Sequence, residues 1–116
     1  IGGLMPAGLF HADHQLTHRA ALMVRREHAR LNWLMYEDAL YRCIAGLLQQ
    51  RLAMLLESGI DATPVAFDTP GNSTIKRRAV RCYRSQLHAL ATAGRPGHRD
   101  LATAERYWLL TPPVYL

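Results

Sequence analysis

The sequence predicts an α/β fold in which helices cross over between the strands of a sheet. Segments whose apolar residues recur at helical spacing alternate with short apolar runs, in the order helix, strand, helix, strand, helix. No internal repeat interrupts this alternation. The chain has 116 residues, 49% of them hydrophobic, which is enough to bury the core of one domain covering residues 1–116.

The first two predicted elements follow an apolar opening segment. Residues 13 to 30 form an amphipathic helix, because apolar side chains recur at helical spacing while arginines take the other faces. Residues 31 to 36 form a buried strand, because the run is short, apolar and aromatic. The apolar positions of the helix are Leu16, Ala20, Met23 and Val24.

A second helix and strand follow. Residues 39 to 57 form a helix with a wide apolar face, and Ser58-Gly59 ends it in the usual way. Residues 63 to 67 form a short strand with Pro64 near its start, where a proline is tolerated. Residues 68 to 72 form a turn.

The third predicted helix begins at Ser73 or Thr74 and runs to about Ala91. Residues 94 to 97 form a loop, and residues 104 to 110 form a last helical turn or a strand before Pro112-Pro113 ends regular structure. The apolar line of the helix is Ile75, Ala79, Cys82, Tyr83, Gln86 and Leu90, and Arg77, Arg81 and Arg84 form a stripe on another face.

The net charge of +5 raises the question of a phosphate-bearing partner. One hypothesis is a basic, helix-rich module that binds nucleic acid or phosphate. It would use Lys76, Arg77, Arg81 and Arg84. A charged stripe on an amphipathic helix is ordinarily its solvated face. No aromatic residue is interleaved with the exposed basic ones, because Tyr83 falls on the apolar side. Both points argue against nucleic acid as the partner.

Two cysteines, Cys43 and Cys82, lack the Cys-x-x-Cys spacing of a structural zinc site or a disulfide scaffold. They are predicted to be small buried hydrophobes within helices, as in the reducing cytoplasm. No apolar run is long enough to span a bilayer, and no secretory signal is visible. The opening Ile1-Gly2-Gly3 lacks an initiator Met, so we expect that the first part of the protein is not included.

Histidines gather in the segment His11-Ala12-Asp13-His14, with His18 one turn further along the helix. His14 and His18 share a helical face, which is the spacing of H-x-x-x-H zinc motifs, so the cluster can supply one or two metal ligands. The alternative is a polar helix N-terminus, with Asp13 as a favourable charge and the histidines in solvent. In sheets of this kind ligands gather in the loops that follow strands, where this segment and residues 36–38 both lie.

Four segments of the chain, taken together, match a known pattern. They are Gly8 to His14, Tyr36-Glu37-Asp38, Lys76 with Tyr83 to Gln86, and Ala104 to Trp108. This combination resembles the PIG-L/LmbE-like family, zinc-dependent enzymes that remove acetyl groups from N-acetylglucosamine-type amino sugars. The resemblance covers roughly residues 7 to 110. It implies a partial Rossmann-like sheet with crossover helices, lacking the N-terminal strands of the full family fold.

The resemblance also implies residue roles. His14 would bind zinc or another divalent metal, His11 would stabilise the oxyanion or donate a proton, and Asp13 would tune His11. Tyr36, Glu37 and Asp38 are candidates for shaping the sugar pocket. The alternative for Glu37 and Asp38 is that they begin a helix, where negative charge is favoured.

Three positions depart from the family pattern. Ala12 replaces the family's proline, which loses rigidity but no chemistry. Leu9 stands where some relatives carry a tyrosine that acts as an auxiliary acid. His18 matches no family ligand and is expected beside a ligand or at the surface.

The family's other two zinc ligands and its catalytic base come from an Ala-His-Pro-Asp-Asp-type motif, which this sequence does not contain. We therefore expect this chain to be the C-terminal part of a zinc-dependent deacetylase, a hydrolase of C–N bonds other than peptide bonds. It would need its N-terminal half in cis or in trans to act on a small amino-sugar substrate. Alone it would bind zinc poorly and be inactive. A non-catalytic homologue of the deacetylase fold is a further alternative, and a homo-oligomer is left open.

Overall fold

A computed structural model of the protein describes residues 2–67, 72–90 and 98–111. Its centre is one four-stranded mixed sheet with the strand order β1-β2-β4-β3. β1 and β2 are parallel, and β4 is antiparallel to both β2 and β3. The predicted α/β class is confirmed. The strands are β1 (Gly2–Pro6), β2 (Asn32–Tyr36), β3 (Asp61–Val65) and β4 (Tyr107–Thr111).

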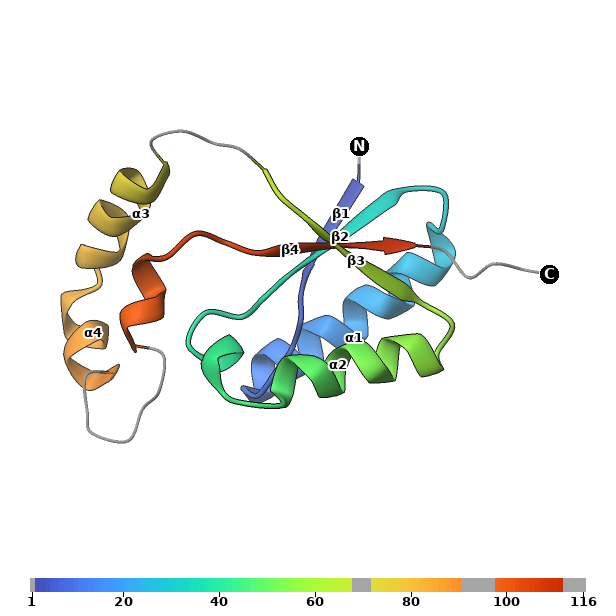
Figure 1. Ribbon diagram of the computed structural model, residues 1–116, viewed down its shortest axis with the longest axis horizontal. Coiled ribbons are helices and arrows are strands. Elements are labelled where there is room, and N and C mark those ends of the chain that lie inside the picture. Colours follow the sequence, from blue (N-terminus) through green and yellow to red (C-terminus); the bar gives the residue numbers. More distant parts are fainter. Residues whose placement is uncertain (1, 68–71, 91–97, 112–116) are drawn as a thin grey trace.

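The helices fall into two groups (Figure 1). α1 (Ala12–Glu27) crosses over from β1 to β2, and α2 (Leu47–Glu57) leads into β3, so that both lie on the same side of the sheet. α3 (Asn72–Arg81) and α4 (Arg84–Leu90) lie beyond one end of the sheet. The 3-10 turn η1 (Tyr41–Cys43) precedes α2. A second turn, η2 (His98–Ala102), contacts α3 and lies between it and the sheet.

The core lies between the sheet and the first two helices. Side chains alternate along a strand, so Trp33 and Met35 of β2 face the helices together with their strand partners Met5 and Leu110. Trp33 lies against Gly3, where a Cβ atom would come within 2.2 Å of the indole ring. Trp33 belongs to the strand predicted to be buried over residues 31–36, and it lies in this core, while the half-buried Trp108 packs against the same cluster.

Two predicted helices are wrong in their extent. The helix predicted over residues 39–57 is interrupted, because Leu40 has φ 72° and Gly46 has φ 89°, which no α-helix accommodates. Only α2 remains of it. The helix predicted from residue 73 to 91 is two helices, because the amides of Cys82 and Tyr83 bond to carbonyls three residues back and so end α3.

The predicted burial of both cysteines is wrong. Cys43 lies in the turn η1 and Cys82 at the break between α3 and α4, and both are free and exposed. Tyr83, expected on a packed face, is 61% exposed, and Ile75 is 65% exposed. The reason is that α3 packs against the short turn η2, which leaves most of the predicted apolar line uncovered.

The remaining described elements are of the type that the sequence predicts, with small differences in their bounds. β3 begins and ends two residues earlier than the strand predicted over residues 63–67. The segment 104–110, predicted as a helical turn or a strand, holds all of β4 except its last residue, Thr111. Most of the turn at 68–72, the loop at 94–97 and Pro112-Pro113 lie outside the described residues. Among the helices that the structure describes, none has the length and apolar character to cross a membrane.

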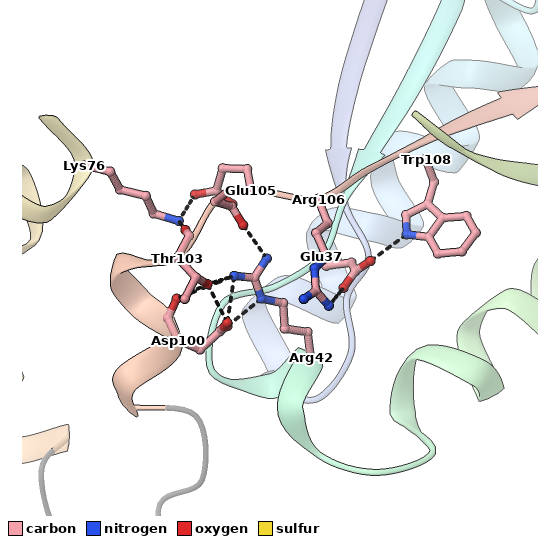
Figure 2. A network of polar contacts seen from close by, with 9 residues as sticks. Glu37, Arg42, Lys76, Asp100, Thr103, Glu105, Arg106 and Trp108 are labelled. Carbon is pink, nitrogen blue, oxygen red and sulfur yellow. Dashed lines mark hydrogen bonds and ion pairs between the residues drawn. The ribbon is translucent and has the colours of Figure 1, made fainter. Parts of the chain in front are cut away.

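A buried arginine fastens η2 to the body of the protein (Figure 2). The Arg42 side chain is 1% exposed, and its Nε and Nη2 donate to the two carboxylate oxygens of Asp100 at 2.5 and 2.8 Å. Arg42 also donates to Oγ1 of Thr103 at 2.6 Å and to the carbonyl of Ala104 at 3.2 Å. Burial alone raises the pKa of Asp100, but the hydrogen bonds from Arg42 and Thr103 and the charge of Arg42 outweigh it and hold this pKa below its usual value.

Two further links extend this network. Lys76 of α3 pairs with Glu105 at 2.5 Å and donates to the carbonyl of Thr103. On the sheet side, Oε2 of Glu37 accepts a hydrogen bond from Nε1 of Trp108 at 2.8 Å, and Nη1 of Arg106 lies 3.9 Å from the other carboxylate oxygen (Figure 2). The network therefore connects α3 to the residues that immediately follow β2.

Candidate functional site

The histidine segment and the Tyr36-Glu37-Asp38 segment meet at the carboxyl ends of the parallel strands β1 and β2. Residues 7–11 follow β1 and lead into α1, while Glu37 and Asp38 follow β2. The two segments come together in one contact, with Nδ1 of His14 lying 3.4 Å from Oδ2 of Asp38. This is the edge of an α/β sheet at which ligands usually bind.

Asp38 is a buried and fixed carboxylate. The residue is 1% exposed, and Oδ2 accepts the backbone N–H of Leu9 at 2.6 Å. Its backbone carbonyl accepts the amide of Arg42 at 2.9 Å. Oδ1 is buried and has no hydrogen-bond partner within the described part of the chain. Asp38 and Glu37 are thus not exposed charges at the start of an α-helix, and that alternative is wrong.

His14 presents one ring nitrogen to Asp38 and the rest of its ring outward. The distance of 3.4 Å is within ion-pair range, although Nδ1 makes no hydrogen bond of good geometry to the residues described. Nδ1 is buried while 43% of the side chain is exposed, so the exposed area belongs to other atoms. Nε2 is therefore the nitrogen left to bind a ligand. An imidazole backed by a carboxylate is the usual arrangement around a metal-bound histidine.

At this site, His14 could bind a metal ion and Asp38 could orient the His14 ring. Residues 2–67, 72–90 and 98–111 contain no group of three or more His, Cys, Asp or Glu side chains placed to hold a metal ion. A catalytic zinc ordinarily takes three protein ligands. His14 and Asp38 can thus form part of such a site, and the described residues do not complete it.

His11 and Asp13 are arranged differently from the roles that the resemblance implies. His11 is the N-cap of α1, and its Nδ1 accepts the backbone N–H of Asp13 at 3.2 Å. The Asp13 carboxylate lies 3.9 Å from the same nitrogen and is 86% exposed. An aspartate that tunes His11 would have to accept a proton from Nδ1, whereas here the lone pair of Nδ1 is occupied by the backbone.

From the sequence, His18 is expected either beside a metal ligand or at the surface. It is fully buried, so the surface alternative is wrong. Its Nδ1 lies 2.8 Å from the carbonyl oxygen of Pro6, and because a carbonyl only accepts, Nδ1 carries the proton. Burial lowers the pKa of His18, and the nearby Arg51 lowers it further against the opposing effects of Pro6 and Asp38. His18 is therefore a neutral imidazole whose lone pair is on Nε2.

Arg51 of α2 holds the loop between β1 and α1. Its Nη2 donates to the carbonyl of Gly8 at 2.8 Å, and Asp38 acts on its pKa electrostatically, opposing the lowering that burial causes. Gly8 has φ 68°, and a Cβ there would come within 2.7 Å of Cβ of His18. Only glycine suits this position. Two features of the sequence could have indicated that Arg51 and His18 belong to the site. One is that Arg51 is a single arginine on the otherwise apolar face of α2, and the other is the spacing between His14 and His18.

A pH titration tests this assignment of His18. Between pH 7 and 5 the unfolded imidazole, with a pKa near 6.5, gains a proton that the folded, buried imidazole resists. The protein is therefore expected to lose stability as the pH falls through this range. Between pH 7 and pH 5, the free energy of unfolding of His18→Gln should fall by less than that of the wild type. Urea titration at the two pH values measures this difference. His28→Gln, a change at an exposed histidine, should retain the wild-type dependence. Equal pH dependence in His18→Gln and the wild type would contradict the assignment.

Aromatic rings border His14 on its exposed side. The ring of Tyr41 stacks on Phe10 with centroids 5.5 Å apart and meets His14 edge-on at 5.9 Å. His11 and His14 lie 5.3 Å apart. Phe10 is 59% exposed, so this aromatic rim, formed by Phe10, His11, His14 and Tyr41, is open to a ligand.

Of the three residues predicted to shape a substrate pocket, only Asp38 contacts the histidines. Glu37 is buried and is engaged by Trp108 and Arg106, which gives it a structural role. Strand alternation places Tyr36 on the sheet face opposite the core. The pKa of Tyr36 is raised by burial, and to a smaller degree by Asp38 and Glu105.

Comparison with known proteins adds no relative to this description. The chain matches no protein-family model, no curated protein and no solved structure.

Proposed function

We propose that this chain supplies one half of the active site of a zinc-dependent amide hydrolase. The enzyme would be a de-N-acetylase acting on an N-acetylglucosamine-type amino sugar or conjugate. The observation that carries the proposal is the contact of the half-exposed His14 with the buried Asp38, at the carboxyl ends of two parallel strands. The parallel β1-α1-β2 unit also accords with a Rossmann-like relationship.

Each residue has a distinct task in this proposal. Nε2 of His14 would hold the metal, and Asp38 would keep the imidazole in place while the Leu9 amide keeps Asp38 in place. When bound, zinc lowers the pKa of a water ligand to about 7 and polarises a carbonyl. His11, exposed at the mouth of the site, would stabilise the developing negative charge on the acetyl oxygen or protonate the leaving amine. The other ligands and the base would come from outside the described residues, in cis or in trans.

The aromatic rim supports a ring-shaped substrate. Phe10 and Tyr41 present aromatic surface within reach of His14. Such surface suits the apolar face of a sugar ring, while the polar groups beside it fix the orientation of the ligand. A sugar whose acetamido group lay against His14 and His11 would then have the aromatic surface of Tyr41 and Phe10 beside its ring.

A metal titration monitored by NMR tests the ligand assignment. Zinc added to the chain is expected to shift the ring signals of His14 at lower concentration than those of His28 and His88, which are exposed and form no ion pair with a buried carboxylate of the described residues. His14→Ala should abolish the most sensitive response, while His88→Ala should leave it unchanged. The assignment fails if His14 responds no earlier than His88. In the complete protein, unchanged zinc affinity after His14→Ala would reject the hydrolase proposal as well.

A further inference from the structure

The positive charge of the protein is concentrated in α3 and α4. Five of the fourteen Lys and Arg residues lie within residues 72–90, and none of the nine Asp and Glu residues does. The remaining nine basic residues balance the nine acidic ones, so this helix pair accounts for the whole net charge of +5. We call α3 and α4 the basic arm. The basic residues of the arm are Lys76, Arg77, Arg78, Arg81 and Arg84.

The arginines of the basic arm face solvent. Lys76 is turned toward the body, where it pairs with Glu105 (Figure 2). At 100° per residue, Arg77, Arg78 and Arg81 lie on the opposite arc of α3, and all three are exposed. None of them, nor the exposed Arg84, pairs with a carboxylate among the residues whose positions are described. Figure 1 places the arm beyond the end of the sheet, with η2 against one side of α3.

Two large apolar side chains accompany these arginines. Ile75 is 65% exposed and lies next to Arg78 on the helical wheel, and Tyr83 is 61% exposed between Arg81 and Arg84 in the chain. An aromatic and an aliphatic residue are thus presented to solvent on a basic surface. Arginines together with exposed apolar and aromatic side chains are the features of a helix that lies on an anionic bilayer.

We propose that the basic arm docks the protein on the surface of an anionic lipid bilayer. The arginines would contact lipid phosphates and carboxylates, and Ile75 and Tyr83 would enter the headgroup region. An exposed isoleucine adds little to contacts with a nucleic-acid backbone, which depend on charge, and it favours the bilayer as the partner. The inference goes beyond the proposed hydrolase and does not depend on it.

Vesicle binding tests the proposal. The chain is expected to co-sediment with phosphatidylcholine vesicles that contain phosphatidylserine, and to bind pure phosphatidylcholine far more weakly. Arg77→Gln/Arg81→Gln should weaken binding about thirtyfold, since each arginine near such a surface contributes about a factor of five. Arg26→Gln/Arg30→Gln makes the same change of charge on exposed residues in the last turn of α1 and in the turn that follows it, and should leave binding unchanged. Circular dichroism should show the same helix content in all variants.

A second pair of residues tests the apolar contribution. Ile75→Ser/Tyr83→Ser keeps every charge and should reduce vesicle binding about tenfold. Most of this loss should be in the binding that remains at high salt, where the electrostatic attraction is screened. Equal binding to charged and neutral vesicles would overturn the proposal, and so would an equal loss in the two arginine double variants. Tighter binding to duplex DNA than to the anionic vesicles, with the same dependence on Arg77 and Arg81, would overturn it in favour of a nucleic-acid surface.

Discussion

Replacing Arg42 with methionine is expected to lower the free energy of unfolding by about 3 kcal/mol. The Arg42 side chain is 1% exposed and donates both to the Asp100 carboxylate and to Thr103. Methionine fills a similar volume but leaves Asp100 without its cation in a largely buried position. Because Asp100 is 12% exposed and can reach some solvent, the lower end of the range for a broken buried pair applies. Urea titration measures the change.

Arg106→Met is the matched control for this experiment. It removes an arginine that is 70% exposed and lies 3.9 Å from Glu37, for which a loss of only about 0–1 kcal/mol is expected. The pH dependence provides a second readout. The lowered pKa of Asp100 contributes stability that is present above about pH 4 and is lost as the pH falls through the folded pKa. In Arg42→Met, most of this pH-dependent contribution to the free energy of unfolding should be absent. Equal losses in the two variants would show that burial of Arg42 contributes nothing.

Replacing Asp38 with asparagine is expected to weaken metal binding strongly while lowering the stability of the protein only slightly. Asparagine keeps an oxygen that can accept the Leu9 amide, so the free energy of unfolding should fall by less than about 1 kcal/mol. The charge beside Nδ1 of His14 is lost, and the zinc concentration that shifts the His14 ring signals should rise about 10- to 100-fold. Asp38→Ala removes the acceptor too and should cost about 2 kcal/mol of stability.

The exposed Asp61 supplies the control for Asp38. Asp61→Asn makes the same chemical change at the start of β3 and should alter neither unfolding nor the zinc response. If Asp38→Asn responds to zinc like the wild type, then Asp38 does not orient His14. If Asp38→Asn unfolds as easily as Asp38→Ala, the carboxylate charge rather than the hydrogen bond to Leu9 stabilises the loop.

Local patterns in the sequence were sufficient to predict the α/β class and the elements α1 and β2. The helical spacing of Leu16, Ala20 and Met23 predicts α1, and the short aromatic run ending at Tyr36 predicts β2. The opening segment, predicted only to be apolar, is the strand β1, and its parallel pairing with β2 places His14 and Asp38 at one edge of the sheet. Both segments are predicted to follow strands, where ligands gather, and the structure adds the contact between them.

Features that depend on contacts between distant segments could not be predicted in this way. The left-handed conformation of Leu40, which interrupts an apolar helical pattern, is one example. Burial of His18 is another, because it depends on the Pro6 carbonyl and on Arg51 from another helix. Tyr83 is exposed although its spacing is that of a packed residue, since among the described elements α3 packs mainly against the short η2. In each case the backbone conformation or the burial of the side chain depends on residues that are distant in the sequence.

The position of β4 has a consequence for how the protein is made. β4, the last of the described strands in chain order, pairs with both β2 and β3, and β3 has no other strand partner in the described sheet. During synthesis the ribosome must therefore release residues 107–111 before these four strands form one sheet. Until then β3 has unpaired backbone groups on both edges, which favours aggregation of a nascent chain.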